Sequence, residues 1–285
     1  MIRPFIKWAG GKTRVLPDLL PLLPKGDCLI EPFVGGASVF LNTDYPSYVL
    51  ADINADLINL YQSAKNETED LIRFSLSLFC HSNSKSDYLS IRKGFNERDR
   101  EGRVGFVSAA IFLYLNRHAF NGLCRYNSNG GFNVPFGKYR APYFPEQEIR
   151  LFAEKANDTG AIFVCADFKE TIRIYAEPGT VIYCDPPYLP VSETANFTQY
   201  HTSTFTPDQH RELADVLLRV NHETGAPVVI SNSDTSVTRE IYQHYQFHEI
   251  AVQRSISGNG ITRGAAKEVI GVLKTCDGVF DGVCE

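Results

Sequence analysis

The chain has 285 residues, of which 44% are hydrophobic and 21% charged, as in ordinary folded proteins. It contains no run near the roughly 18 apolar residues of a membrane span, and its first residues lack the apolar core of a secretory signal. The seven cysteines are scattered without a C-x-x-C pair, which argues against a disulfide framework or a zinc site. We therefore expect one large domain, or one domain with an insert, in the reducing cytoplasm and without a membrane partner.

Charge is unevenly distributed along the chain. The net charge is −5, but residues 91–140 hold nine Lys or Arg against three Asp or Glu, which gives this segment +6 and leaves −11 for the remainder. A basic module in an acidic body is typical of a local site for a polyanion such as nucleic acid. The alternative is a solvated basic face.

The first part of the chain alternates between predicted strands and helices. Residues 28–34 form an apolar run that leads into a glycine pair, and residues 37–41 have the character of a helix start. A second apolar run, 48–54, is followed by helical spacing over 55–65. This order of strand, glycine turn, helix and strand predicts the front half of a doubly wound α/β fold.

The pattern changes in the middle of the chain. Residues 70–79 and 104–115 have helical spacing and are joined by polar segments, whereas 116–143 is rich in Asn, Gly, Arg and aromatic residues and has no clean period. Such a long irregular segment is either functional or a separate module. We therefore predict a mostly helical insert over residues 58–142.

Strand and helix alternate again after the insert. The predicted strands are 162–165, 180–184 and 227–231. The predicted helices are 145–157, 207–223 and 235–245. A final stretch, 247–274, resembles a β-hairpin around residues 257–260. Residues 1–57 and 143–285 are therefore expected to form one α/β domain.

Asp185-Pro186-Pro187-Tyr188 directly follows the predicted strand 180–184. A carboxylate at the carboxyl end of a buried parallel strand lies where open α/β sheets bind ligands. The two prolines fix an extended exit from the strand, which leaves the carbonyl of the first one free and aimed. Two acceptors beside an aromatic face suit a planar group with an exocyclic amino group, such as a nucleobase.

Other strand ends and glycine turns supply candidates for a nucleotide-like ligand. Gly35 and Gly36 permit close backbone approach before a helix N-terminus, although the full G-x-G-x-x-G pattern is missing and a structural turn is the alternative. Asp52 could accept hydrogen bonds from ribose hydroxyls or cap the next helix. Asp167 and Phe168 could hold an adenine edge and face, or serve as a cap and a core ring.

Two further motifs contain unusual residues. Residues 7–12, Lys-Trp-Ala-Gly-Gly-Lys, include the only Trp, which could contact a ligand or be simple core, and Lys12 could meet a carboxylate. Residues 116–127 combine Arg, Asn and aromatic side chains within the basic insert. Arg pairs with guanine and Asn with adenine in the major groove, and Phe120 could wedge into a base stack. The alternative for this motif is a polar loop stabilised by its own Asn side chains.

These motifs, in this order, resemble the Dam family of DNA adenine-N6 methyltransferases (D12 class) over nearly the whole chain. The resemblance rests on residues 7–12, 31–36, 50–54, 112–117, 121–127, 132–137, 185–188, 196–198, 200–201 and 254–260. It implies a Rossmann-like methyltransferase sheet, S-adenosylmethionine as methyl donor, duplex DNA with the site GATC, and no metal. Residues 1–57 and 143–285 would be the catalytic domain and 58–142 the target-recognition insert. We expect the protein to be a monomer in solution. We expect it to lie in the cytoplasm, associated with the nucleoid of a bacterial cell, or to be encoded by a phage.

The resemblance and the residue patterns together give three sets of candidate residues. The catalytic set is Asp185, Pro186, Pro187 and Tyr188. The cofactor-binding set is Trp8, Ala9, Gly10, Lys12, Pro32, Phe33, Gly35, Gly36, Ser38, Asp52, Ile53, Asp167, Phe168 and Asp185. The DNA-binding set is Lys7, Arg92, Arg117, Phe120, Asn121, Leu123, Arg125, Asn127, Pro135, Tyr139, Asn196, Tyr200, Arg254, Asn259 and Arg263. Phe120 departs from the family's best-known members, which carry Tyr there, so the ring is kept and a hydroxyl contact is lost.

The expected mechanism begins with the target adenine flipped out of the duplex. Asp185 and the carbonyl of Pro186 would accept its two N–H bonds while Tyr188 stacks on the base, which orients the nitrogen and stabilises its developing charge. Two other classes remain as alternatives. A nicotinamide oxidoreductase could share the strand–glycine–helix–strand start, and a non-catalytic DNA-binding regulator could have an occluded cofactor pocket. RNA, or another amino-bearing base, is a milder variant.

Overall fold

The computed structural model describes residues 1–98, 102–189, 205–253 and 265–273. At its centre lies a seven-stranded sheet with the strand order β3-β2-β1-β4-β5-β7-β6. The strands are β1 (Cys28–Glu31), β2 (Ser47–Asp52), β3 (Ile162–Cys165), β4 (Thr180–Cys184), β5 (Val228–Ser233), β6 (Tyr245–Gln253) and β7 (Ala265–Leu273). β1 to β5 are parallel, and β7 runs antiparallel to both β5 and β6. The predicted Rossmann-like, doubly wound α/β sheet with a late hairpin is therefore confirmed.

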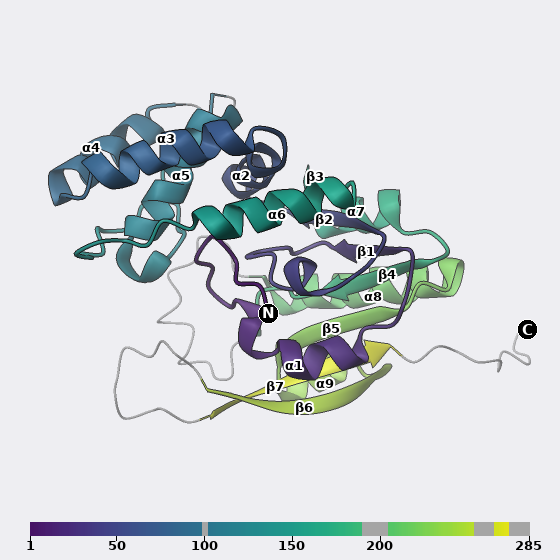
Figure 1. The fold of residues 1–285 in the computed structure, drawn as a ribbon. Helices are drawn as coiled ribbons and strands as arrows, with labels where there is room; N and C mark the ends of the chain where they lie inside the picture. The colour runs from purple at the N-terminus through teal and green to yellow at the C-terminus, as the bar shows by residue number, and fades with distance from the viewer. Residues whose placement is uncertain (99–101, 190–204, 254–264, 274–285) are drawn as a thin grey trace, which may run out of the picture.

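Helices cover both faces of this sheet (Figure 1). α1 (Leu16–Leu19), α2 (Ala55–Asn66) and α6 (Glu146–Asp158) pack on one face, and α7 (Phe168–Tyr175), α8 (Pro207–Thr224) and α9 (Ser236–Ile241) pack on the other. Side chains alternate along a strand, so Leu29 of β1 joins the first core and Ile30 joins the second. Both faces are buried, which explains why β4 reads as a continuous apolar run.

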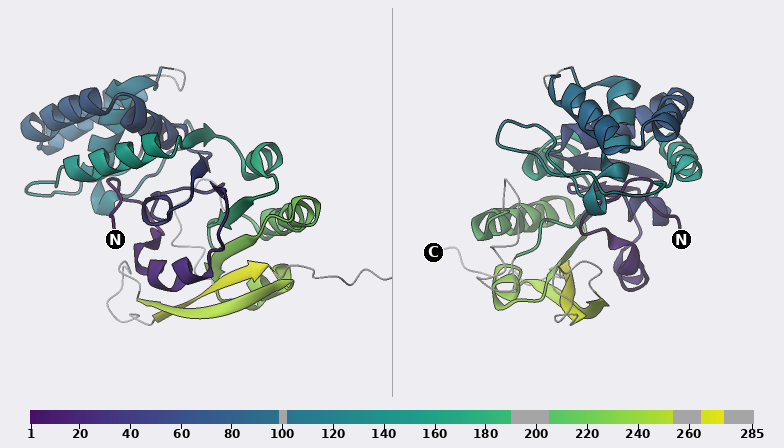
Figure 2. Two further views of the ribbon diagram at one scale, coloured as in Figure 1. Left: turned by 45° about the vertical axis from the view of Figure 1, so that its right-hand side comes forward. Right: turned by 90° about the vertical axis from the view of Figure 1, so that its left-hand side faces the viewer.

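The middle of the chain forms a helical body beside the sheet, made of α3 (Thr68–His81), α4 (Lys85–Asn96) and α5 (Gly105–His118). In both views of Figure 2 this body and the β6–β7 hairpin lie at opposite ends of the molecule. α2 packs against α5 as well as α6, so one continuous core joins the helical body to the sheet. The chain between β2 and β3 is thus mostly helical, while the division into a catalytic domain and an insert over residues 58–142 stays a prediction, and residue 58 falls within α2.

The structure corrects three sequence-based expectations about individual elements. Residues 85–96 were expected to be a polar connection, but a capping box between Ser84 and Asp87 starts α4 there. Residues 37–41 do not form an α-helix, because Ala37 has a φ of 58° and only a 3₁₀ turn (Phe40–Asn42) follows. The helix expected over 235–245 ends at Ile241, since Tyr245 already pairs in β6.

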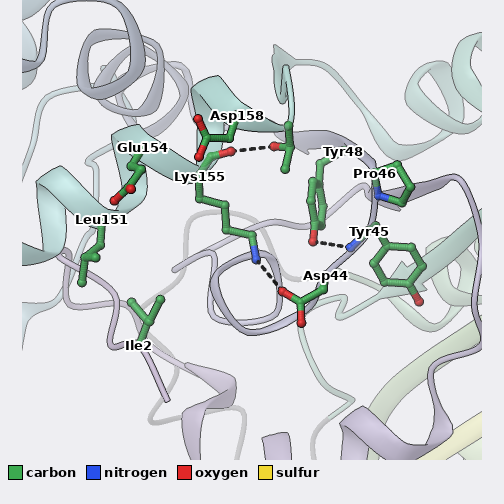
Figure 3. Close-up of a pocket in the computed structure, with 10 residues that line it drawn as sticks. Ile2, Asp44, Tyr45, Pro46, Tyr48, Leu151, Glu154, Lys155 and Asp158 are labelled. Atoms are coloured by element: carbon green, nitrogen blue, oxygen red, sulfur yellow. Dashed lines mark hydrogen bonds and ion pairs between the residues drawn. The ribbon is translucent and has the colours of Figure 1, made fainter.

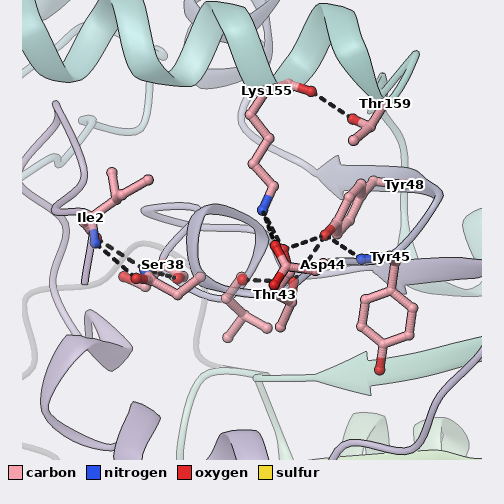
Figure 4. A network of polar contacts seen from close by, with 10 residues as sticks. Ile2, Ser38, Thr43, Asp44, Tyr45, Tyr48, Lys155 and Thr159 are labelled. Atoms are coloured by element: carbon pink, nitrogen blue, oxygen red, sulfur yellow. Dashed lines mark hydrogen bonds and ion pairs between the residues drawn. The ribbon is translucent and has the colours of Figure 1, made fainter.

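A shallow cavity of about 420 Å³ opens beside the turn that precedes β2, at the amino ends of the strands (Figure 3). There, Lys155 of α6 donates to the carbonyl oxygen of Thr43 and lies 4.0 Å from a carboxylate oxygen of Asp44. The hydroxyl of Tyr48 donates to the same carbonyl at 2.7 Å and accepts from the backbone N–H of Tyr45 at 2.9 Å (Figure 4). This network fixes the turn, and it lies at the opposite edge of the sheet from the candidate active site.

None of the helices in the described ranges combines the length and apolar character that crossing a membrane requires. Across the same ranges, no group of three or more His, Cys, Asp and Glu side chains is placed to hold a metal ion.

Candidate active site

The candidate cofactor and catalytic residues converge where the strand order reverses. The chain proceeds outward from β1 to β3, then returns to add β4 on the other side of β1. Ligands of open α/β sheets bind at such a switch point, outside the carboxyl ends of the strands. The turn after β1, Asp52 at the end of β2 and Asp185 after β4 all lie at this edge.

Asp185 is paired with a lysine from the N-terminal segment. The ammonium of Lys12 lies 2.8 Å from Oδ1 of Asp185, and their side chains are only 8% and 19% exposed. The same ammonium donates to the carbonyl oxygen of Gly10 at 3.1 Å. Burial raises the pKa of Asp185 to about 6, and the nearby Lys12 opposes that rise. The carboxyl group is therefore mostly ionised at neutral pH and available as an acceptor.

Tyr188 is the last residue of Asp185-Pro186-Pro187-Tyr188, here termed the tetrad. Both the hydroxyl and the ring of Tyr188 have a partner. Its hydroxyl donates to Oε2 of Glu268 on β7 at 3.0 Å. The Lys12 ammonium lies 4.5 Å from the centre of its ring, a cation–π contact. Burial raises the pKa of Tyr188 well above its usual range, so the phenol keeps its proton. No local sequence pattern indicates that Glu268 contacts this site.

The backbone of the tetrad is supported by His210 of α8, which is fully buried. Its Nε2 lies 3.1 Å from the carbonyl oxygen of Pro187, and its Nδ1 lies 2.9 Å from the hydroxyl of Tyr242. A carbonyl can only accept, so Nε2 carries the proton and Nδ1 accepts from Tyr242. Burial lowers the pKa of His210 to about 4, which keeps it neutral. Sequence reasoning missed this residue.

The glycine turn after β1 is shaped by Trp8. Gly35 has a φ of +45°, and a Cβ added there would lie 3.0 Å from the indole ring, while one on Gly36 would lie 3.2 Å from Trp8 Cβ. Glycine is therefore needed at Gly35 for both its backbone conformation and the close packing of Trp8. Pro32 and Ser38 are buried on either side of this turn, whereas Ala9 and Gly10 are exposed.

Asp52 joins the turn after β1 to the end of β2. Its carboxylate accepts from the backbone N–H of Gly35 at 3.2 Å and of Asn54 at 2.9 Å. Burial raises its pKa to about 6, although these hydrogen bonds oppose the rise. Asn54 rather than Asp52 caps α2, since its side chain accepts from the N–H of Leu57. Ile53 between them is 71% exposed at this edge.

An aromatic cluster lies beside the turn on the α7–α8 face. Phe33 stacks on Phe168 with ring centres 5.7 Å apart, and Phe205 meets both rings edge-on. Phe168 is 2% exposed, and Asp167 caps α7 by accepting from the N–H of Lys169. These contacts account for Asp167 and Phe168 as a cap and a core ring; a part in cofactor binding stays a prediction.

The candidate DNA-binding residues of the insert lie around residues 116–139, here termed the recognition segment. Asn116 exchanges two hydrogen bonds with the backbone of Lys7 at 3.0 and 2.8 Å, which pins the N-terminal segment beside α5. The Lys7 ammonium lies 4.4 Å above the ring of Tyr139. Gly122 has a φ of +64°, and a Cβ there would collide with the Lys7 side chain. The N-terminus and the recognition segment therefore form one surface.

Other members of the DNA-binding set differ in their exposure and in the backbone groups to which they are bonded. Phe120 is 50% exposed, and its backbone N–H donates to the carbonyl oxygen of Pro135 at 2.9 Å. Arg125 donates twice to the carbonyl oxygen of Asn133, at 3.1 and 2.7 Å. Arg92 donates to the carbonyl oxygen of Val134 at 2.8 Å.

The remaining members of that set have local or buried settings. Asn121 is exposed in a left-handed conformation, and Leu123 is half-buried. Arg117 is 8% exposed with its guanidinium over the ring of Tyr143. The side chain of Asn127 accepts from the backbone N–H of Asn129 and Gly131. Five predicted residues lie outside the described ranges: Asn196, Tyr200, Arg254, Asn259 and Arg263.

Sequence comparisons with known proteins identify one family. The model of the D12 class N6 adenine-specific DNA methyltransferase family matches residues 8–256. The DNA adenine methylase of Serratia marcescens is 48% identical over 273 residues, covering 95% of this chain and 98% of that protein. That of Escherichia coli strain K12 is 49% identical over 273 residues, covering 95% of both. A solved rRNA methylase from Streptococcus thermophilus covers 92% of this chain and 95% of its own, with 9% identity and a TM-score of 0.32.

The family match spans most of the chain, and the methylases that resemble it are nearly half identical along almost their whole length. The chain therefore belongs to the D12 class of N6 adenine-specific DNA methyltransferases, and its activity is the methylation of adenine N6 in DNA.

Proposed function

We propose that the protein transfers a methyl group from S-adenosylmethionine to N6 of a flipped-out adenine in duplex GATC. The observation that carries this proposal is the placement of Asp185, Pro186 and Tyr188 at the carboxyl end of β4, next to the strand-order switch. The carboxylate is buried and paired with Lys12 rather than solvated. Such a site suits the recognition of an exocyclic amino group more than phosphate binding or hydride transfer.

The residues at this edge fit S-adenosylmethionine. A carboxylate offers about four acceptor sites. Asp52 uses some of them for the N–H groups of Gly35 and Asn54, which leaves room for a ribose hydroxyl. Trp8 and Phe33 supply aromatic surface on either side of the glycine turn. When bound, this cofactor supplies an electrophilic methyl group on a sulfonium sulfur.

The tetrad prepares the adenine amino group for attack. Its lone pair is delocalised into the ring, so hydrogen bonds from the two N–H groups to Asp185 and the Pro186 carbonyl favour a more tetrahedral nitrogen. The same two acceptors stabilise the positive charge that develops on this nitrogen. Tyr188 presents a ring fixed through Glu268, on which the flipped base stacks. The main contribution is orientation of nucleophile and methyl group.

The preference for GATC is proposed from the recognition segment and its resemblance to the family. In this proposal the exposed ring of Phe120 enters the base stack. Arg125 exchanges its two hydrogen bonds to the carbonyl oxygen of Asn133 for hydrogen bonds to guanine O6 and N7. Lys7 and Tyr139 complete the same surface.

We also propose that the protein is a monomer and that it acts on DNA in the bacterial cytoplasm. Sedimentation tests the oligomeric state.

The experiment is transfer of labelled methyl from S-adenosylmethionine to a short duplex with one GATC. The controls are a duplex with the site scrambled and the Asp185→Ala protein. The proposal expects label only in the GATC duplex and only with intact Asp185. Equal label in both duplexes would remove the GATC assignment while keeping the chemistry. Full activity of Asp185→Ala would overturn the proposed role of the tetrad.

A further inference from the structure

Tyr126 of the recognition segment reaches back to the first turn of α2. Its hydroxyl lies 2.7 Å from Oδ2 of Asp56 and 3.3 Å from Oδ1 of Asn54. A phenol has one proton to donate, so the shorter contact to the Asp56 carboxylate is the stronger hydrogen bond. The side-chain amide of Asn54 also lies 3.7 Å from the sulfur of Cys124. Two residues of the recognition segment therefore meet α2 at one place.

That place follows directly after the proposed cofactor carboxylate. Asn54 donates its backbone N–H to Oδ1 of Asp52 at 2.9 Å and caps α2 through its side chain at 3.1 Å. Asp52, Asn54 and Asp56 therefore belong to one short turn that is held by its own hydrogen bonds. A shift of this turn at Asp56 moves Asp52 as well, because few free torsions separate them.

Arg103 completes the junction from the other side. Its guanidinium lies 3.6 Å from Oδ2 of Asp56, with side chains only 6% and 11% exposed. It also donates to the carbonyl oxygen of Gly130 at 3.2 Å, within the recognition segment. Removing one partner from a buried polar group costs more than the hydrogen bond itself contributes. Moving the recognition segment away from α2 therefore breaks two hydrogen bonds in this partly buried junction, Tyr126 to Asp56 and Arg103 to the carbonyl of Gly130.

We propose that Tyr126 is a positioning residue that couples target recognition to cofactor binding through Asp56 and Asn54. This inference rests on the proposed function of Asp52 and of the recognition segment. DNA that fixes the recognition segment also fixes the turn that holds Asp52, so the specific duplex raises the affinity for the cofactor. Linkage requires that the cofactor raises the affinity for the specific duplex by the same factor.

The test compares Tyr126→Phe with the unaltered protein. The variant keeps the ring, whose edge contacts Phe132 with centres 5.9 Å apart, and removes only the hydroxyl. The dissociation constant of S-adenosylhomocysteine is measured calorimetrically without DNA, with the GATC duplex and with the scrambled duplex. The ratio of the first two constants is the coupling factor. A merely structural loss of stability would not change this ratio selectively.

The matched control is Tyr114→Phe, which removes a hydroxyl bonded to the carbonyl oxygen of Ser82 at 2.6 Å in the same helical body. Allosteric factors are typically about 5- to 150-fold. We expect such a factor with the GATC duplex in the unaltered protein and in Tyr114→Phe, and a factor near one in Tyr126→Phe.

Two results overturn the coupling role: an unchanged factor in Tyr126→Phe, or no coupling in an unaltered protein that does methylate GATC. An unaltered protein that neither binds S-adenosylhomocysteine nor transfers methyl instead overturns the proposed function, and the coupling falls with it.

Discussion

The ammonium of Lys12 lies 2.8 Å from Oδ1 of Asp185, so the carboxylate that we propose as the acceptor of the adenine amino group has a cationic partner. Desolvation alone would favour the neutral carboxylic acid, which could accept only weakly. The lysine offsets part of that effect and keeps the carboxylate charged within a buried site. The same ammonium lies 4.5 Å from the centre of the Tyr188 ring, so Lys12 contacts both the first and the last residue of Asp185-Pro186-Pro187-Tyr188.

The pH dependence of methylation follows from this pair. In the proposed mechanism the Asp185 carboxylate is the active form, and its pKa is raised to about 6, so kcat/KM should fall as the pH drops through about 6. Lys12→Met removes the charge that lowers this pKa, so the acidic limb should move to higher pH. Rates of methyl transfer between pH 5 and 9 give the acidic limb of both proteins.

The control for the lysine is Lys169→Met, which breaks an exposed pair with Glu212 at 3.0 Å. Exposed pairs contribute little, so its profile should coincide with that of the unaltered protein. If the limb of Lys12→Met also stays in place, Lys12 does not set the charge state of Asp185.

His210 is expected to act on catalysis through the carbonyl of Pro187. His210→Phe removes the donor to that carbonyl, which costs about 0.5–1.5 kcal/mol and lowers kcat by up to roughly tenfold if the whole loss falls on the transition state. His210→Gln still carries a donor and should recover most of kcat. Steady-state kinetics separate kcat from KM, and thermal denaturation checks that both variants fold. Equal kcat values in the two variants would exclude the hydrogen bond as the cause.

Much of the sheet could be predicted from the sequence, because its parallel strands are buried on both faces. β4 is a run of five buried residues, and such a run has no other stable place in a small domain. The helix α4 could not be predicted as easily, because its buried face consists of little more than Tyr88 and Phe95 within a polar segment. The capping box between Ser84 and Asp87 was the one local signal that could have marked its start.

Some residues of the proposed site could likewise be predicted from the sequence, and others could not. Asp185 and Asp52 follow strands, so a sequence rule places them at the binding edge. Glu268 reaches Tyr188 only because β7 inserts antiparallel between β5 and β6, where it pairs opposite Ser233. His210 reaches Pro187 only because α8 packs behind β4. Contacts that depend on the register of distant elements leave no mark in local spacing.

Gly122→Ala tests whether the packing of Lys7 on the recognition segment matters for target choice. The added Cβ would collide with Lys7, and the φ of +64° adds roughly 1–2 kcal/mol of strain. We expect the preference for GATC over single-substituted sites to decrease, with the dissociation constant of the cofactor in the absence of DNA unchanged. The control is Gly160→Ala, whose φ is +60° but whose Cβ would meet no atom within 4 Å. An equal loss of preference in both variants would mean that strain alone is responsible.

Glu31, at the end of β1, should make the stability of the protein depend on pH. It is 2% exposed, and burial raises its pKa from 4.5 to about 8, with Asp185 adding to the rise. The folded state favours the neutral form of Glu31. Its contribution to the free energy of unfolding is therefore complete below about pH 4.5 and is lost as the pH rises through about 8. The free energy of unfolding should therefore fall between pH 6.5 and 8.5.

Glu31→Gln keeps the shape of the side chain but cannot ionise, so its unfolding free energy should stay nearly constant over this range. Asp52 and Asp185, whose pKa values are raised to about 6, titrate mostly below this range and leave it to Glu31. Glu69→Gln, at an exposed carboxylate paired with Arg150, is the control and should keep the slope of the unaltered protein. Urea denaturation at several pH values measures all three proteins. A slope that persists in Glu31→Gln would show that another group, not this glutamate, titrates in the folded protein.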